Sequence, residues 1–233
     1  MLTIAAHCWL CRLPLYHSRW GICSFCQRHL PAPPLCCPRC GLPAVDASRQ
    51  CGRCLQHPPP WQSMTFVSDY APPFSTLLKL FKFQGKTELA TVLARQILLT
   101  WLKAYREHAQ RNAIPLYRPD MLVTVPLHKR RQWLRGFNQT ECLARPLAHW
   151  LGCEYSPQTI RRQRQTRIQQ TLSASARRNN LRGAFACAVP LTGKQVVLLD
   201  DVVTTGSTAA EISRLLLAQG AIGVQVWCLC RTL

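Results

Sequence analysis

An apolar strand that runs into two acidic residues and then into a glycine-containing loop constrains this chain more than any other feature. Residues 196–199 are wholly apolar, and Asp200 and Asp201 follow them directly. A short loop rich in hydroxyl groups comes next, at residues 204–208. A continuous apolar run of this length is typical of a strand covered on both faces, as in parallel sheets. Residues 208–219 then have helical spacing, so the string predicts a strand–loop–helix unit of an α/β protein.

The loop has the composition of a phosphate cradle. Gly206 permits a tight turn and a close approach to a ligand, and the following helix adds the positive end of its dipole. Hydroxyl donors surround the glycine, at Thr204, Thr205, Ser207 and Thr208. Asp200 and Asp201 come too early to touch that phosphate, so they suit sugar hydroxyls or a Mg²⁺ ion that bridges those hydroxyls to a second phosphate. Thr208 and Glu211 also fit a capping box, a purely structural role.

Strands and helices alternate from residue 61 onward. Apolar runs of strand length occur at residues 121–125, 195–199 and 222–229. Helical spacing occurs at residues 87–105, 137–151 and 208–219. The alternation predicts a parallel sheet with helices on both faces, and the ligands of such sheets bind beyond the carboxyl ends of the strands.

The first 54 residues hold nine of the 14 cysteines. Eight of them form four C-x-x-C pairs, namely Cys8/Cys11, Cys23/Cys26, Cys37/Cys40 and Cys51/Cys54. Because two such turns close one tetrahedral zinc shell, four pairs provide the ligands for two Zn²⁺ ions. Neighbouring pairs are favoured as partners, the first two on one ion and the last two on the other. Cys36 is left over; it could replace Cys37, but the C-P-R-C-G turn at residues 37–41 makes the better zinc knuckle.

A disulfide cluster and a redox C-x-x-C are the alternatives to zinc. Residues 1–7 lack the basic start and the cleavage pattern of a signal peptide, which favours zinc over disulfides, and a redox role would need one pair. Because the segment has little aliphatic spacing, we expect metal binding to drive its folding. Three prolines at residues 58–60 form a stiff connector. The predicted division is a double zinc-ribbon module at residues 1–60 and an α/β domain at residues 61–233.

The formal charge of +19 is concentrated, since residues 121–190 carry 12 basic and 2 acidic residues. This distribution is expected of a protein with a polyanionic partner, either nucleic acid or a phosphorylated small molecule, and composition alone leaves a solvated basic face as an equal alternative. Arginines pair with phosphates and aromatic rings stack on bases. The predicted nucleic-acid contacts are Arg130, Arg131, Trp133, Arg135, Arg161, Arg162, Arg164 and Arg167. Residues 161–180 lack an apolar period and are also expected to form a mobile flap, and Phe137 is expected to pack in the core.

The string at residues 196–208 resembles the motif by which type I phosphoribosyltransferases bind phosphoribosyl pyrophosphate (PRPP). The resemblance implies a phosphoribosyltransferase-like fold, with Asp200 and Asp201 as the catalytic acids on the ribose and Mg²⁺ bound with PRPP. It also implies a pyrophosphate loop after an earlier strand and a flap that closes over PRPP. The PRPP-binding residues it implies are Asp200, Asp201, Val203, Thr204, Thr205, Gly206, Ser207, Thr208, Leu127, His128 and Lys129.

Further blocks resemble the ComF family, including its GntX branch. The P-L-H string at residues 126–128 with R-G-F-N-Q at residues 135–139 is similar to one family block, and R-x-T-x-x-Q-x-x-L at residues 164–172 is similar to another. The N-terminal cysteine pairs match as well, with Cys36 as an extra residue. The resemblance covers essentially the whole chain and implies a cytoplasmic protein linked to natural transformation or to the use of DNA as a nutrient.

Three functions remain open at this stage. The first is a DNA-handling protein that binds PRPP and single-stranded DNA, with DNA-uptake or helicase-type proteins as candidate partners. The second is an active phosphoribosyltransferase acting on an unidentified base or nucleotide, and the third is a regulator that senses PRPP. The charge exceeds what one PRPP requires, which favours the first. A membrane span is not expected, because no apolar run approaches about 18 residues.

Overall fold

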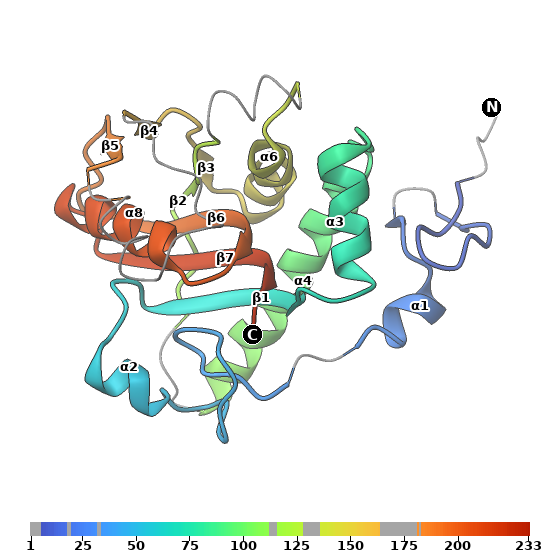
Figure 1. Cartoon of the computed structure of the whole chain (residues 1–233), viewed down its shortest axis with the longest axis horizontal. Coiled ribbons are helices and arrows are strands. Elements are labelled where there is room, and N and C mark those ends of the chain that lie inside the picture. Colours follow the sequence, from blue (N-terminus) through green and yellow to red (C-terminus); the bar gives the residue numbers. More distant parts are fainter. Residues whose placement is uncertain are drawn as a thin grey trace.

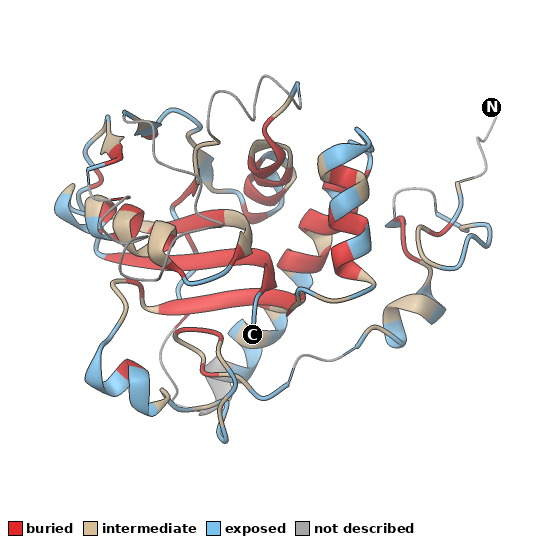
Figure 2. Cartoon of the chain, in the orientation of Figure 1, coloured by how far each residue is buried: buried red, intermediate tan, exposed pale blue. Residues whose placement is uncertain are grey.

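The computed structural model describes residues 6–17, 20–31, 34–111, 116–127, 136–163, 181 and 183–233. In these residues, five parallel strands form one sheet in the order β1-β7-β6-β2-β3 (Figure 1). Their bounds are β1 (Ser63–Asp69), β2 (Met121–Thr124), β3 (Glu154–Tyr155), β6 (Gln195–Val203) and β7 (Gly223–Arg231). The two longest strands, β6 and β7, lie at the centre, where both faces are covered and their apolar runs are buried (Figure 2).

Helices cover both faces of the sheet. One face carries α3 (Phe74–Phe83), α4 (Leu89–Arg111) and α6 (Gln139–Leu151), which share a core with Leu122, Val197 and Trp227. The other face carries α8 (Ser207–Ala218) and an antiparallel pair, β4 (Ile160–Arg162) with β5 (Phe185–Cys187). The predicted α/β architecture, a parallel sheet flanked by helices, is confirmed. In the described part of the chain, no helix is long and apolar enough to cross a bilayer.

Two features near the loop differ from the sequence prediction. Strand β6 does not end at Leu199 but continues through both aspartates to Val203, because β7 extends alongside it and pairs with it as far as Arg231. The predicted capping box of Thr208 and Glu211 at the start of α8 is also wrong. Gly206 is the N-cap of α8 without a side-chain bond, and the Glu211 carboxylate accepts a hydrogen bond from the backbone N–H of Gly183 (3.0 Å) instead.

Strand β1 was not predicted, and its sequence explains why. The segment S-M-T-F-V-S-D alternates polar and apolar residues only over its first four positions and holds no continuous apolar run of strand length, yet all but its last residue are buried. Its polar side chains are buried because β7 covers one edge of the strand and the second cysteine segment, which contains Cys37 to Cys54, lies against the other. At that edge the backbone N–H of Met64 donates a hydrogen bond to the carbonyl of Pro38 (2.9 Å).

The two halves of the cysteine region lie at different places on the sheet domain (Figure 1). The first half, with the short helix α1 (Ser24–Arg28), packs against α4, where the Gln27 and Gln96 side chains exchange hydrogen bonds of 3.0 and 2.7 Å. The second half, with the short helix α2 (Gly52–Gln56), packs beside β1.

Candidate functional site

The acidic pair lies at the carboxyl end of β6. The Asp200 carboxylate accepts a hydrogen bond from the backbone N–H of Asp201 (2.8 Å). The Asp201 carboxylate pairs with the Lys82 ammonium at 2.8 Å, and only 13% of the Lys82 side chain and 16% of the Asp201 side chain are exposed. Lys82 comes from the last turn of α3 and was missed by the sequence analysis, because its position in a partly basic helix resembles that of a solvent-facing lysine.

The environment of the pair changes its proton affinity. Burial raises the pKa of Asp200 to about 7, and the neighbouring Asp201 charge adds to the shift. The Asp201 N–H and the Lys82 ammonium oppose it and lower the pKa. Carboxylate oxygens are the ligands that hard divalent cations prefer, and such a cation beside Asp200 would favour its ionised form.

The phosphate loop, residues 204–208, turns sharply at Gly206, whose φ of +74° is disfavoured for other residues. The Thr205 and Ser207 hydroxyls lie 2.9 Å apart, and Thr204 and Thr205 are exposed. The N–H groups in the first turn of α8 have no partner within the helix and carry the positive end of its dipole. The predicted cradle residues are therefore gathered at one helix start.

Two residues that the sequence analysis missed support this loop. Arg231, at the end of β7, donates hydrogen bonds to the carbonyls of Val203 and Thr204. The Trp61 ring lies against Gly206, where an added Cβ would come within 3.0 Å of it. No sequence signal marks either residue, because one follows a connector and the other ends an ordinary buried strand.

The predicted pyrophosphate loop begins beside the acidic pair. The backbone N–H of Val125 donates to the carbonyl of Leu199 (3.0 Å), so the carboxyl end of β2 lies next to that of β6. Leu127 is half-buried two residues further on. His128 and Lys129 lie outside the described residues.

Arg161 and Arg162 belong to strand β4 and are paired with β5, and the remainder of the predicted flap, residues 164–180, lies outside the described residues. Arg161 is exposed, and the Arg162 guanidinium lies 5.5 Å from the centre of the Phe185 ring. The other predicted nucleic-acid contacts lie outside the described residues, namely Arg130, Arg131, Trp133, Arg135, Arg164 and Arg167. Phe137 packs against Phe81, with ring centres 5.7 Å apart, as expected of a core residue.

The eight paired cysteines form two tetrads, with neighbouring pairs together as the sequence favours. The first tetrad is Cys8, Cys11, Cys23 and Cys26, and the second is Cys37, Cys40, Cys51 and Cys54. Within each tetrad all four Sγ atoms lie within 4.8 Å of one another.

The sulfur separations fit zinc. A tetrahedral shell with Zn–S bonds of about 2.3 Å has S···S edges of about 3.8 Å. The Sγ atoms of Cys11 and Cys23 are 3.7 Å apart, those of Cys37 and Cys54 are 3.9 Å apart, and those of Cys40 and Cys51 are 3.7 Å apart. These are not disulfide distances. Both tetrads could hold Zn²⁺, and such an ion would serve as a structural cross-link.

The thiols of the second tetrad change one another's proton affinity. Burial favours a raised pKa for Cys37, but backbone N–H donors from Cys51, Cys40 and Arg39 outweigh it and lower the pKa to about 7. Burial raises the pKa of Cys40 to about 11, and the Cys37 charge adds to that shift. One ionised thiolate therefore raises the pKa of the next thiol. A divalent cation at the centre of the tetrad would offset this repulsion between the thiolates.

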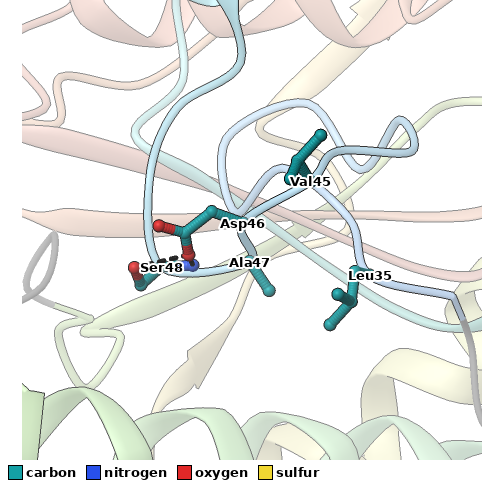
Figure 3. A pocket seen from close by; sticks show the side chains of 5 residues that line it. All are labelled: Leu35, Val45, Asp46, Ala47 and Ser48. Carbon is teal, nitrogen blue, oxygen red and sulfur yellow. Dashed lines mark hydrogen bonds between the residues drawn. The ribbon is translucent and has the colours of Figure 1, made fainter.

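A surface hollow lies on the outer loop of the second cysteine segment, lined by Leu35, Val45, Asp46, Ala47 and Ser48 (Figure 3). The Asp46 carboxylate accepts hydrogen bonds from the backbone N–H and the hydroxyl of Ser48 (2.7 and 2.6 Å). The hollow therefore has its carboxylate engaged locally, and it shares no lining residue with the acidic pair or the phosphate loop.

Comparison with known proteins identifies relatives along the whole chain. The chain is 54% identical to the DNA utilization protein YhgH of Salmonella typhi over 233 residues, which is 100% of both chains. It is 38% identical to competence protein F of Haemophilus influenzae, over 96% of each chain. The chain belongs to the ComF family. This confirms the family resemblance found in the sequence.

No family model matches the sequence. Among solved structures, a purine phosphoribosyltransferase from Pyrococcus horikoshii aligns with 56% of this chain and 68% of its own, at 16% identity and a TM-score of 0.32. The α/β architecture of this ComF-family chain rests on its strand order and on the placement of β6 and α8.

Proposed function

We propose that this chain is a DNA-handling protein that binds PRPP with Mg²⁺ at the carboxyl end of β6 and binds single-stranded DNA through its basic region. One observation carries the proposal. Strand β6, the phosphate loop and α8 form one continuous unit, with Asp200 and Asp201 at the strand end and the hydroxyl groups at the helix start. We also propose that residues 1–60 are a double zinc-ribbon module and that residues 61–233 are the phosphoribosyltransferase-like domain.

The chemistry of the unit suits PRPP. A 5-phosphate on the loop would meet the first N–H groups of α8 and the Thr205 and Ser207 hydroxyls. The Asp200 and Asp201 carboxylates suit the ribose hydroxyls and Mg²⁺, since hard cations prefer oxygen ligands. His128 and Lys129 follow the neighbouring strand β2, and their positive charge would neutralise the pyrophosphate.

The DNA part of the proposal rests on charge and on the relatives. The names DNA utilization protein and competence protein F describe roles in handling DNA. A charge of +19, with 12 basic residues between positions 121 and 190, suits a long polyanion better than one small phosphate ester. DNA-uptake or helicase-type proteins in the cytoplasm are the partners that this role implies.

A second candidate function, phosphoribosyl transfer, is favoured by the Asp200 carboxyl. A carboxyl whose pKa lies near 7 can accept and return a proton at physiological pH, which suits general acid–base catalysis. Release of pyrophosphate from PRPP in the presence of a panel of bases tests this candidate. Absence of release alongside tight PRPP binding would leave the binding role and exclude transfer to those bases.

A side-by-side titration tests the main proposal. Purified zinc-loaded protein is titrated with PRPP and Mg²⁺, and separately with a single-stranded oligonucleotide, at two salt concentrations. Each phosphate neutralised on a single strand contributes about 0.7 to the slope of log affinity against log salt, so we expect a steep slope for the oligonucleotide. Replacing both Arg161 and Arg162 with alanine lowers that slope by about 1.4 if both contact phosphates. An oligonucleotide that fails to bind at low salt contradicts the DNA part.

A further inference from the structure

One buried side chain joins the second cysteine tetrad to the phosphate loop. Arg231 ends strand β7 and is 5% exposed. Its Nε donates a hydrogen bond to the carbonyl of Cys40 (3.2 Å), a member of the tetrad. Its Nη1 donates to three further carbonyls, those of Val203 (3.1 Å), Thr204 and Thr232 (3.0 Å). The guanidinium fork therefore holds the zinc knuckle and the start of the loop together.

A tryptophan makes a second connection between the same two parts. Arg39 lies inside the knuckle, between Cys37 and Cys40, and the Trp61 indole N–H donates to its carbonyl (2.6 Å). The Arg39 Nε in turn donates to the carbonyl of Trp61 (3.1 Å). The far edge of the same ring lies against Gly206, at the turn of the loop. The knuckle thus supports the loop at two points, its first residues and its turn.

The charge of a loaded tetrad would stabilise this arrangement. A buried guanidinium costs free energy unless a negative charge compensates it. In the described residues, the recorded hydrogen-bond partners of Arg231 are main-chain carbonyls. Four thiolates and one Zn²⁺ carry a net charge of −2 next to the Cys40 carbonyl that Arg231 binds. Metal binding would therefore fix both the geometry and the charge of the knuckle.

We propose that Arg231 is a positioning residue through which the metal-loaded second tetrad holds the phosphate loop in its ligand-binding shape. The role of this link in ligand binding rests on the phosphate site proposed above. The structural link from the second tetrad through Arg231 to the loop does not depend on that proposal. Coupling between the affinities of two sites is reciprocal, so a ligand on the loop also strengthens the binding of metal to the second tetrad.

The first tetrad provides a matched control. Its recorded contacts reach α4, through the Gln27–Gln96 pair and through Gly21, which lies against Val92. Cys23 and Cys51 are equivalent, since each is the third cysteine of its tetrad and the N-cap of a short helix. Replacing either with serine removes one ligand.

Hydrogen exchange of the loop amides tests the proposal without any ligand. The exchange of a peptide covering residues 203–208 is compared in wild type, Cys51→Ser, Cys23→Ser and Arg231→Lys. We expect exchange to be about tenfold faster in Cys51→Ser and in Arg231→Lys, because a charge-assisted hydrogen bond worth about that factor is lost. We expect no change in Cys23→Ser. The Arg231→Lys variant should keep two zinc ions per chain, so its effect is not a loss of metal.

Equal exchange of the loop in wild type and Cys51→Ser, or in wild type and zinc-loaded Arg231→Lys, overturns the proposal. If Arg231→Lys fails to fold, wild type alone still tests the link through equilibrium competition for zinc with a chromogenic chelator. Ribose 5-phosphate should raise the affinity of one of the two zinc sites about tenfold and leave the other unchanged. Ribose 5-phosphate that binds without changing either zinc affinity contradicts the link. Absence of ribose 5-phosphate binding contradicts the proposed phosphate site. In that case, hydrogen exchange of the loop in wild type and Cys51→Ser still tests the link.

Discussion

The two cysteine tetrads have nearly the same ligand spacing but different neighbours. The first lies against the surface of α4, with Gly21 close to Val92 and the Gln27 side chain bonded to Gln96. The second lies against β1 and the end of β7, and Arg231 connects it to the phosphate loop. Two copies of one motif can thus have different roles, because the role depends on what each knuckle contacts.

Removing metal is expected to have the largest effect on both tetrads. Zinc contributes about 10–16 kcal/mol of folding free energy in small zinc-binding peptides, and the buried cluster inside the second segment consists of Cys37, Cys40 and Cys54. We expect about two zinc ions per chain and the unfolding of both cysteine segments after chelation. Elemental analysis of protein purified without chelator measures the first, and hydrogen exchange after chelation measures the second. Metal-free protein with intact disulfides would contradict both.

Alanine substitutions at Gly21 and Gly41 compare how closely the first and second cysteine segments pack against the rest of the chain. Gly21 and Gly41 both have positive φ, of 66° and 68°, so alanine costs about 1–2 kcal/mol of backbone strain at either position. At Gly21 the new Cβ would also come within 2.1 Å of the Val92 side chain, which adds about 1–3 kcal/mol of overpacking. At Gly41 its nearest neighbours would be the Met64 sulfur at 3.0 Å and the Phe66 ring at 3.1 Å, which need to move by only a few tenths of an ångström. Denaturant unfolding of zinc-loaded protein should show a loss of about 4 kcal/mol for Gly21→Ala and about half of that for Gly41→Ala. Equal losses would show that the first segment does not pack against α4 this closely.

The Lys82→Met substitution tests the ion pair between Lys82 of α3 and Asp201 of the acidic pair. Breaking a mostly buried ion pair leaves the Asp201 carboxylate uncompensated, so we expect a loss of about 3 kcal/mol of unfolding free energy. Adding Asp201→Asn to Lys82→Met should restore most of it. Urea unfolding of the two single variants and the double variant measures the coupling between these residues. Additive losses would mean that the two side chains do not form a pair.

The smallest expected effect is the pH dependence of ligand binding. Because the pKa of Asp200 is raised to about 7, its contribution to stability is present below its ordinary pKa of 3.8 and is lost as the pH rises through about 7. Binding of Mg²⁺ with PRPP needs the ionised carboxylate, whose fraction rises about fivefold between pH 6 and pH 7, so affinity should rise by up to that factor. Calorimetry at several pH values measures this rise. The Asp200→Asn variant, which lacks the titrating carboxyl, should not show it.

The sequence predicted the phosphate unit because its parts are consecutive. The strand, the acids, the loop and the helix follow one another within residues 195–219, so local patterns describe the whole unit. The grouping of the cysteines was predictable for the same reason. Lys82, Trp61 and Arg231 were not, because they reach the site from α3, from the residues before β1 and from the end of β7.

The errors have physical causes of the same kind. The length of β6 depends on its pairing with β7, and the burial of β1 depends on the second cysteine segment. Neither property can therefore be predicted from the residues of the strand alone. Glu211 matches the capping pattern, but it bonds the backbone of Gly183, and only the tertiary structure brings these two together.

The PRPP site that we propose consists of the acids and the loop at the end of β6. Calorimetric titration with PRPP and Mg²⁺ compares zinc-loaded wild type with the Asp200→Asn/Asp201→Asn variant. We expect saturable binding to wild type and binding about a hundredfold weaker in the variant, since two charged contacts worth about 1.5 kcal/mol each are removed. Equal affinity in the two proteins, or no binding to wild type, would show that these acids do not bind PRPP.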